Sequence, residues 1–276
     1  MNKKKHLYNK VNSEELKLAL ANEPFERITA SFYKYIDISV PNELRDELYE
    51  VWNKMGVFGR VYIADEGINA QVSIPQPNWE IFKKSVLSND LFRGIIIKKA
   101  IQEGSSFYKL KIKVRKELVA YDVPKESFDM RKVGKHLTAS DYNLAIESKD
   151  STVVDMRNYY ESEIGRFENA IIPDVETSKE LLPEVKKLLK GKENEKILLY
   201  CTGGIRCEKA SSYLIKNGFN DVNQLQGGII QYAHEIKSNN MESKFRGKNF
   251  VFDDRLGERI TDDVLSFCHM CSDSCD

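Results

Sequence analysis

The spacing of apolar positions predicts alternating strands and helices along the first 120 residues. The run at 28–38 is aromatic and β-branched, which is typical of a strand. The next segment repeats apolar residues at a helical period: Leu44, Leu48, Val51 and Met55. Two short strands around residues 65–67, a helix at 78–88 and a final strand at 107–120 follow. The order β-α-β-β-α-β predicts a ferredoxin-like domain over residues 1–122.

The second half of the chain alternates short apolar runs with helical segments. The runs at 153–156, 197–200 and 222–225 are short enough to be buried strands, and amphipathic segments separate them. This alternation predicts a doubly wound parallel sheet covered by helices on both faces. We assign this domain to residues 123–240, with a linker at its start, and residues 241–276 to a C-terminal tail.

Composition and charge narrow the class of protein. Of the 276 residues 41% are hydrophobic, and 42 basic side chains balance 42 acidic ones, so nucleic-acid binding would need a local basic patch. No apolar run approaches the roughly 18 residues of a membrane span, and the basic start is not followed by the apolar segment of a secretory signal. The five cysteines form two clusters after residue 200, which favours a reducing cytoplasm over a disulfide-linked secreted protein.

The most informative stretch is the loop after the strand that ends at Tyr200. Cys201 lies at the carboxyl end of that strand, where ligands bind in open α/β sheets, and a helix begins near Arg206. Loop amides, the helix N-terminus and the arginine can stabilise a thiolate below the free pKa of about 8.5. We therefore predict that Cys201 is the nucleophile. The residues expected to form the anion cradle around it are Thr202, Gly203, Gly204, Ile205 and Arg206.

A second cysteine follows the loop directly. Cys207 should lie in the first helical turn, close to Cys201. It is either a resolving thiol that forms a disulfide with an oxidised or persulfidated Cys201, or a small residue that packs the helix. The sequence favours neither.

The spacing Cys-x-x-x-x-Arg at a strand-to-helix turn resembles the active-site loop of the rhodanese superfamily. The upstream segment VVDMRNYYESEIGRFENAI resembles the other hallmark of that superfamily. In this segment Asp155 and Arg157 follow the first buried strand. They are candidates either for a direct role or for a structural ion pair that ties the sheet to the loop.

The flanking segments resemble one bacterial family, the rhodanese-containing tRNA uridine hydroxylases. The motifs GRVYIADEGINAQVS, KIKVRKELVAYDVP and NFVFDDRLGERI recur in order around CTGGIRCEKAS. The resemblance implies a cytoplasmic tRNA-modifying oxidoreductase that uses molecular oxygen to convert the wobble uridine to 5-hydroxyuridine. It also implies an essential Cys201 and no obvious flavin, haem or iron cofactor. The alternative is a sulfurtransferase that carries a persulfide on Cys201.

One predicted strand alternates basic and apolar residues. Its cations fall on one face, since successive strand residues point to opposite sides: Lys109, Lys111, Lys113 and Arg115. Such a stripe can contact RNA phosphates, or it can protect an edge strand from aggregation. The family resemblance favours RNA, with the tRNA anticodon stem-loop as the partner.

The tail contains three cysteines, Cys268, Cys271 and Cys275, and it resembles the start of a cysteine-rich tail in family members. The Cys-x-x-Cys spacing is a common half of a zinc site. A structural zinc takes four ligands, and His269 is awkwardly placed beside Cys268. The sequence therefore leaves zinc in the tail as an open prediction.

Overall fold

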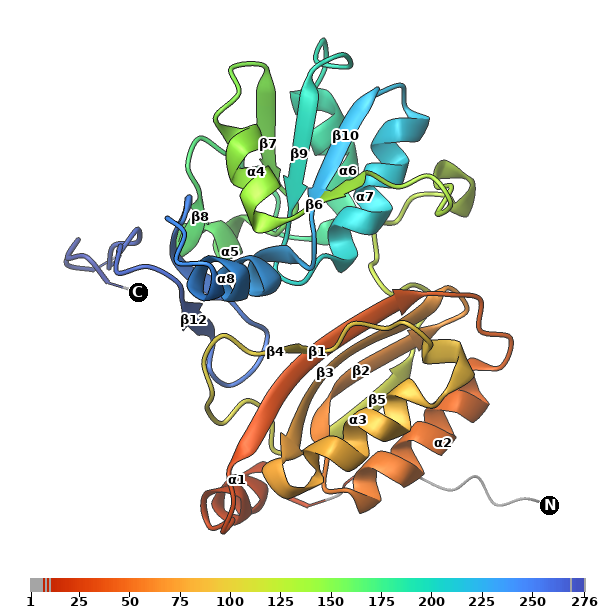
Figure 1. Ribbon diagram of the computed structural model, residues 1–276. Coiled ribbons are helices and arrows are strands. Elements are labelled where there is room, and N and C mark those ends of the chain that lie inside the picture. The colour runs from red at the N-terminus through yellow and green to blue at the C-terminus, as the bar shows by residue number, and fades with distance from the viewer. Residues whose placement is uncertain (1–6, 8, 10, 269, 276) are drawn as a thin grey trace. The chain divides into compact units, whose positions relative to one another are not determined.

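The computed structural model describes residues 7, 9, 11–268 and 270–275 and divides into two compact units (Figure 1). Unit 1 comprises Met1–Leu118 with Asp253–Arg255, and unit 2 comprises Val119–Phe252 with Leu256–Asp276. The short later segment is held in unit 1 by backbone contacts, because the Asp254 amide donates to the Ser106 carbonyl at 3.1 Å. Each unit has its own hydrophobic core.

Unit 1 is a five-stranded sheet with two helices packed on one face. Its strands are β1 (Arg27–Tyr35), β2 (Phe58–Ala64), β3 (Gly67–Pro75), β4 (Lys98–Lys99) and β5 (Leu110–Val114), in the spatial order β4-β1-β3-β2-β5. Its helices are α1 (Ser13–Ala21), α2 (Pro41–Lys54) and α3 (Trp79–Leu87), with 3₁₀ turns η1 (Gln76–Asn78) and η2 (Asp90–Phe92). The first four strands have the ferredoxin-like arrangement that the sequence predicts.

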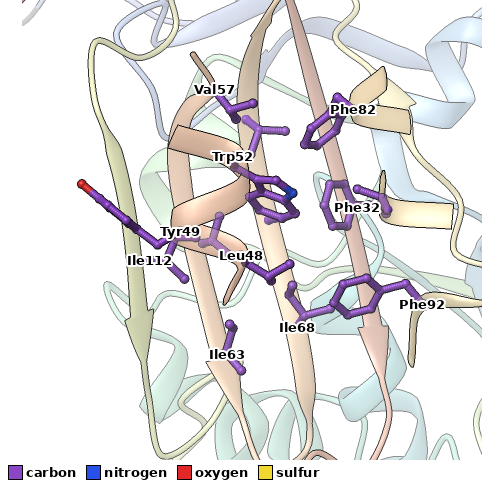
Figure 2. Packing of buried hydrophobic residues seen from close by; sticks show 14 of the residues in the cluster. Phe32, Leu48, Tyr49, Trp52, Val57, Ile63, Ile68, Phe82, Phe92 and Ile112 are labelled. Atoms are coloured by element: carbon purple, nitrogen blue, oxygen red, sulfur yellow. The ribbon is translucent and has the colours of Figure 1, made fainter. Parts of the chain in front are cut away.

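The core of unit 1 lies between the sheet and helices α2 and α3 (Figure 2). Trp52 of α2 packs edge-on against Phe32 of β1 at 6.1 Å between ring centroids, and against Phe82 of α3 at 5.3 Å. All three rings are at most 1% exposed. Burial of each such side chain stabilises the fold by about 1.5–3 kcal/mol, so this cluster fixes which face of the sheet is turned inward.

The last strand of unit 1 differs from the prediction. The expected strand at 107–120 is only Leu110–Val114, and it pairs parallel to β2 as an added edge strand. The fourth strand of the β-α-β-β-α-β order is instead β4, whose residues Lys98 and Lys99 pair with β1. A two-residue strand has no detectable periodicity, so the sequence pattern could not reveal it.

Unit 2 contains a four-stranded parallel sheet in the order β6-β10-β9-β7. These strands are β6 (Lys135–Leu137), β7 (Ser151–Asp155), β9 (Lys196–Tyr200) and β10 (Asp221–Leu225). Its helices are α4 (Ala139–Ile146), α5 (Tyr159–Glu163), α6 (Ser178–Leu188), α7 (Ile205–Lys216) and α8 (Gly228–Ser238), with a 3₁₀ turn η3 (Lys125–Ser127).

The parallel sheet is covered on both faces. Ile197 and Leu199 of β9 lie in one core with side chains of α6 and α7. Leu198 and Tyr200 lie in the other core, with side chains of α4 and α8. The predicted doubly wound sheet is confirmed.

A second, three-stranded sheet and one strand of the parallel sheet were not predicted in unit 2. Strands β8 (Gly165–Phe167), β11 (Phe245–Phe250) and β12 (Gly257–Arg259) form a small antiparallel sheet in the order β12-β11-β8. Part of the expected tail is therefore sheet: β11 pairs antiparallel with β8, and Phe245 packs on Phe167 at 5.4 Å between ring centroids. Strand β6 lies in the expected linker. Both the small sheet and β6 form by pairing with strands that are distant in the sequence, and local periodicity does not reveal them.

Among the described residues, none of the helices has both the length and the hydropathy of a membrane span.

Candidate active site

Cys201 lies at the carboxyl end of β9, and α7 begins four residues later. The side chains of Cys201 and Cys207 are both fully buried, and all five cysteines of the chain are free. Gly204 has a φ of +100° as the residue that precedes α7, which favours glycine there. The φ of Gly203 is not left-handed, and a Cβ at this position would meet no atom within 4 Å, so only one of the two loop glycines is required by the turn.

The loop stabilises a negative charge on the Cys201 sulfur. The Gly204 amide donates to Sγ at 3.2 Å. Burial of the thiol acts to raise its pKa, but the hydrogen bond from the Cys207 thiol, the charge of Arg206 and the backbone amides outweigh it and lower the pKa to about 6. At pH 7 the sulfur is therefore mainly thiolate. This is the state that a cysteine nucleophile needs.

Cys207 is the opposite kind of thiol. Burial raises its pKa well above the usual value, and the hydrogen bond and charge of Cys201 raise it further. Cys207 is thus a neutral thiol that donates to a thiolate. The structure brings the two sulfurs together, as the sequence suggested, and a resolving role for Cys207 stays a prediction.

Arg206 is held by a carboxylate that the sequence interpretation missed. Its guanidinium binds both oxygens of Glu161, with Nη1 at 2.5 Å from Oε1 and Nη2 at 2.9 Å from Oε2. Nη2 also donates to Thr202 Oγ1 at 3.0 Å, and the Tyr121 hydroxyl donates to the Arg206 carbonyl at 2.9 Å. Glu161 is fully buried. Arg206 is therefore fixed at the loop by a buried ion pair and not by contact with solvent.

A local signal for Glu161 exists in the sequence. Asn158 precedes α5 and Glu161 is the third residue after it, which forms a capping box in the structure. The Asn158 amide donates to Glu161 Oε1 at 2.9 Å, so the same oxygen accepts from both the helix cap and Arg206. The capping pattern places the carboxylate, but only the fold shows that it reaches the loop.

Asp155 and Arg157 form a second buried ion pair. Arg157 Nη2 lies 2.7 Å from Asp155 Oδ2 and donates to the Gly165 carbonyl at 2.6 Å. Ser162 Oγ donates to Asp155 Oδ2 at 3.0 Å. These contacts join the end of β7 to α5 and β8, which is what a structural pair would do.

The start of α8 packs directly on the Cys201 loop. The Ile229 amide donates to the Cys201 carbonyl at 3.0 Å, and the Ile230 amide donates to the Thr202 carbonyl at 3.1 Å. Gly228 has a φ of +69°, and a Cβ at this position would lie 2.5 Å from the Cys201 carbonyl oxygen. The loop carbonyls therefore point to α8, which leaves loop amides free to point at the sulfur.

The remaining predicted residues lie elsewhere in the chain. Lys111 and Lys113 are exposed on β5 of unit 1, with Lys109 just before the strand and Arg115 just after it. Ile205 is half-buried at the first position of α7.

The tail cysteines lie close to one another. Backbone amides of Cys271 and Met270 and the thiols of Cys271 and Cys275 lower the pKa of Cys268. Even so, within residues 7, 9, 11–268 and 270–275 no group of three or more His, Cys, Asp or Glu side chains is arranged to hold a metal ion. His269 lies outside the described residues. Zinc in the tail stays a prediction.

Two family models match this chain, one in each unit. Residues 27–118 match the family model described as a UPF0176 acylphosphatase-like domain, and residues 138–235 match the rhodanese-like domain. A solved rhodanese-like domain protein from Staphylococcus aureus is 27% identical, with a TM-score of 0.30 over 36% of this chain and 90% of that one.

Two curated relatives cover nearly the whole chain. The tRNA uridine(34) hydroxylase of Leptospira interrogans is 52% identical over 99% of this chain and 75% of that protein. The tRNA uridine(34) hydroxylase of Salmonella choleraesuis is 45% identical over 98% of this chain and 78% of that protein. With a rhodanese-like loop around Cys201 and relatives of this identity on both units, the chain belongs to the tRNA uridine(34) hydroxylase family.

Proposed function

We propose that this protein hydroxylates uridine 34 of tRNA and that the Cys201 thiolate is its nucleophile. The observation that carries the proposal is the buried Cys201 sulfur, whose pKa is lowered to about 6 by Cys207, Arg206 and the loop amides. Groups that are buried and whose pKa is strongly shifted by specific neighbours cluster at functional sites. A buried thiol that its neighbours keep ionised is therefore a candidate nucleophile. The relatives supply the reaction, because they are named for hydroxylation of this uridine.

We place the substrate uridine in the anticodon stem-loop and the reaction in the cytoplasm, with molecular oxygen as co-substrate. One oxygen atom of O₂ enters the C5–H bond of uracil, and the other must be reduced to water by two electrons and two protons. A pair of thiols supplies both as it becomes a disulfide. Cys201 and Cys207 are such a pair, since the two thiols are hydrogen-bonded. An external thiol would then reduce the disulfide.

Two routes fit this balance. In one, the thiolate adds to uracil C6, C5 then bonds to O₂ as a hydroperoxide, and the Cys207 thiol takes the outer oxygen as a sulfenic acid, which leaves C5 hydroxylated. Loss of the C5 proton expels the Cys201 thiolate, which attacks that sulfenic acid to form the disulfide and release water. In the other, O₂ is first reduced to hydrogen peroxide as the Cys201–Cys207 disulfide forms, and an external thiol reduces that disulfide. The peroxide then oxidises Cys201 to a sulfenic acid with release of water, and the sulfenic acid transfers its oxygen to C5 while the displaced C5 proton restores the thiol. Both routes need the Cys201 sulfur to touch the base. Because Cys201 is 0% exposed, the loop around Gly203 must shift to admit a uracil ring, which also requires extrusion of the base from its stack.

The experiment is mass spectrometry of nucleosides from tRNA incubated aerobically with the wild-type protein and with Cys201→Ala. We expect 5-hydroxyuridine with the wild type and none with the variant. Substantial product from Cys201→Ala would contradict the proposed nucleophile. Absence of product from the wild type, together with thiosulfate-dependent persulfide on Cys201, would instead support a sulfurtransferase.

A further inference from the structure

The face of the unit 1 sheet that lies opposite α2 and α3 is polar, aromatic and basic. Its composition follows from strand register. Tyr33 of β1 lies opposite Asn69 of β3, Asn69 lies opposite Tyr62 of β2, and Tyr62 lies opposite Lys113 of β5. One row across four strands thus carries two tyrosines, an amide and a cation.

The next row repeats this chemistry without the rings. Ser31 of β1 lies opposite Gln71 of β3, Gln71 opposite Arg60 of β2, and Arg60 opposite Lys111 of β5. At the far edge Lys98 of β4, which is buried, pairs with Ser31. We call these two rows the open face.

Residues of the open face alternate with residues of the core. Phe32, Val61 and Ile112 lie in the cluster under the helices, so their strand neighbours point to the other side. Tyr33 and Tyr62 are half-buried. Part of each ring is therefore exposed.

Cations lie against both tyrosine rings. The Arg115 guanidinium is 5.3 Å from the centroid of the Tyr62 ring, and Lys98 Nζ is 4.9 Å from that of Tyr33. None of the residues of β1, β2, β3 and β5, all of which the structure describes, is Asp or Glu. The sheet therefore presents flat rings beside positive charge with no acidic side chain among its long strands.

The positive charges repel one another. Partial burial lowers the pKa of Lys111, and the charges of Lys109, Arg60 and Lys113 lower it further. An anion placed over these side chains would relieve the repulsion.

One end of the sheet is already closed. Thr29 is buried and its hydroxyl lies 2.7 Å from the hydroxyl of Ser106, which belongs to the loop between β4 and β5. The loop between β4 and β5 therefore covers the face at its Thr29 end.

We propose that the open face binds single-stranded RNA, with unpaired bases stacked on Tyr62 and Tyr33 and with phosphates on Lys111 and Lys113. Unstacked bases are the part of an RNA that aromatic rings on a sheet can take, whereas a duplex hides its bases. The proposal rests on tRNA being the substrate, and it assigns the loop nucleotides of the anticodon arm to unit 1.

The test measures binding and not hydroxylation. A fluorescently labelled anticodon stem-loop RNA is titrated with full-length protein, and its anisotropy gives the dissociation constant. Loss of a stacked base costs about 1–3 kcal/mol, so Tyr62→Leu should weaken binding on the order of 5- to 150-fold. Tyr62→Phe keeps the ring and should bind as wild type does. Circular dichroism and the unfolding midpoint confirm that each variant is folded.

A charge-matched pair of variants tests the phosphate contacts. Lys111→Gln with Lys113→Gln removes two cations from the open face, whereas Lys54→Gln with Lys84→Gln removes two exposed cations from α2 and α3. We expect only the first pair to weaken binding and to flatten the salt dependence, by about 1.4 in the slope of log K against log salt.

The outcomes separate this proposal from the proposed reaction. Tyr62→Leu that binds the stem-loop within about twofold of wild type would overturn stacking on the open face, even in a protein that makes 5-hydroxyuridine. Equal competition by duplex RNA would overturn the preference for unpaired bases. A protein without hydroxylase activity whose RNA binding still depends on Tyr62 would refute the reaction and support the open face.

Discussion

The buried ion pair between Arg206 and Glu161 gives the sharpest prediction, because one substitution should alter two separate measurements. In Arg206→Gln the Glu161 carboxylate stays in a fully buried position without its cation. Removal of one partner of a buried pair costs about 3–5 kcal/mol. We therefore expect the free energy of unfolding in urea to fall by that amount.

The same substitution removes a charge that stabilises the Cys201 thiolate. Arg206 is one of the groups that lower the pKa of Cys201, so the pKa of Cys201 should rise in Arg206→Gln. Ultraviolet absorbance of the thiolate, titrated against pH with Cys201→Ser as the blank, measures this shift. The hydroxylation rate in a single turnover should then reach its plateau at a higher pH than in the wild type.

Glu161→Gln is the matched control. It also breaks the ion pair, and we expect a similar loss of stability, but it leaves the Arg206 cation in place and should not raise the pKa of Cys201. The double variant Arg206→Gln with Glu161→Gln buries no unpaired charge and should be more stable than the sum of the two losses allows, with a coupling of about 1–3 kcal/mol.

Two results would refute this reasoning. If Arg206→Gln lost less than about 1 kcal/mol, the pair would not be held in the buried geometry that the distances describe. If both single variants shifted the pKa of Cys201 equally, then the loop's shape, and not the charge of Arg206, would stabilise the thiolate.

Three further predictions follow from the site and the tail. Because the folded pKa of Cys201 is depressed to about 6, its thiolate contributes stability that is present above the unfolded pKa and is lost as pH falls through 6. The difference in free energy of unfolding between wild type and Cys201→Ser should therefore grow by on the order of 1 kcal/mol per pH unit from pH 6 to 8. A difference that does not change with pH would contradict the low pKa. Gly228→Ala should lower the unfolding temperature sharply, since its Cβ would lie 2.5 Å from the Cys201 carbonyl oxygen. The Cβ of Gly203→Ala would meet no atom within 4 Å, so this variant should keep the wild-type unfolding temperature. Equal effects of the two variants would rule out the close packing of α8 on the Cys201 loop. Elemental analysis decides the metal prediction for the tail: about one zinc per chain that is lost in Cys268→Ser would support it, and zinc-free protein would contradict it.

Periodicity predicted the elements that bury one continuous face. The helix at α2 and the strands β7, β9 and β10 were all foreseen from apolar spacing, because each buries its pattern against a core within its own unit. The short strands β4, β6 and β12 were not foreseen. Each has two or three residues, too few for a period, and exists only because a neighbouring strand offers hydrogen bonds.

The candidate site divides in the same way. Cys201, Gly204, Arg206 and Cys207 were predicted together because they lie within seven consecutive residues, where a strand-to-helix turn fixes their positions. Glu161 was missed because it lies 45 residues before Arg206 and is hydrogen-bonded to its own helix cap. Nothing in the local pattern requires a second partner for that carboxylate.

The sequence by itself determined the local chemistry of this protein: the alternation of strands and helices, the thiol at a strand end, and a stripe of cations on one strand. Those features depend on atoms a few residues apart, whose geometry the backbone repeats set. Only the tertiary structure decided which distant groups meet, namely Glu161 with Arg206, Gly228 with the Cys201 carbonyl, and Arg60 with Lys111. These contacts follow from the register of the strands and the packing of the helices. Register and packing are governed by burial of whole faces, so they leave no signal at any single sequence position.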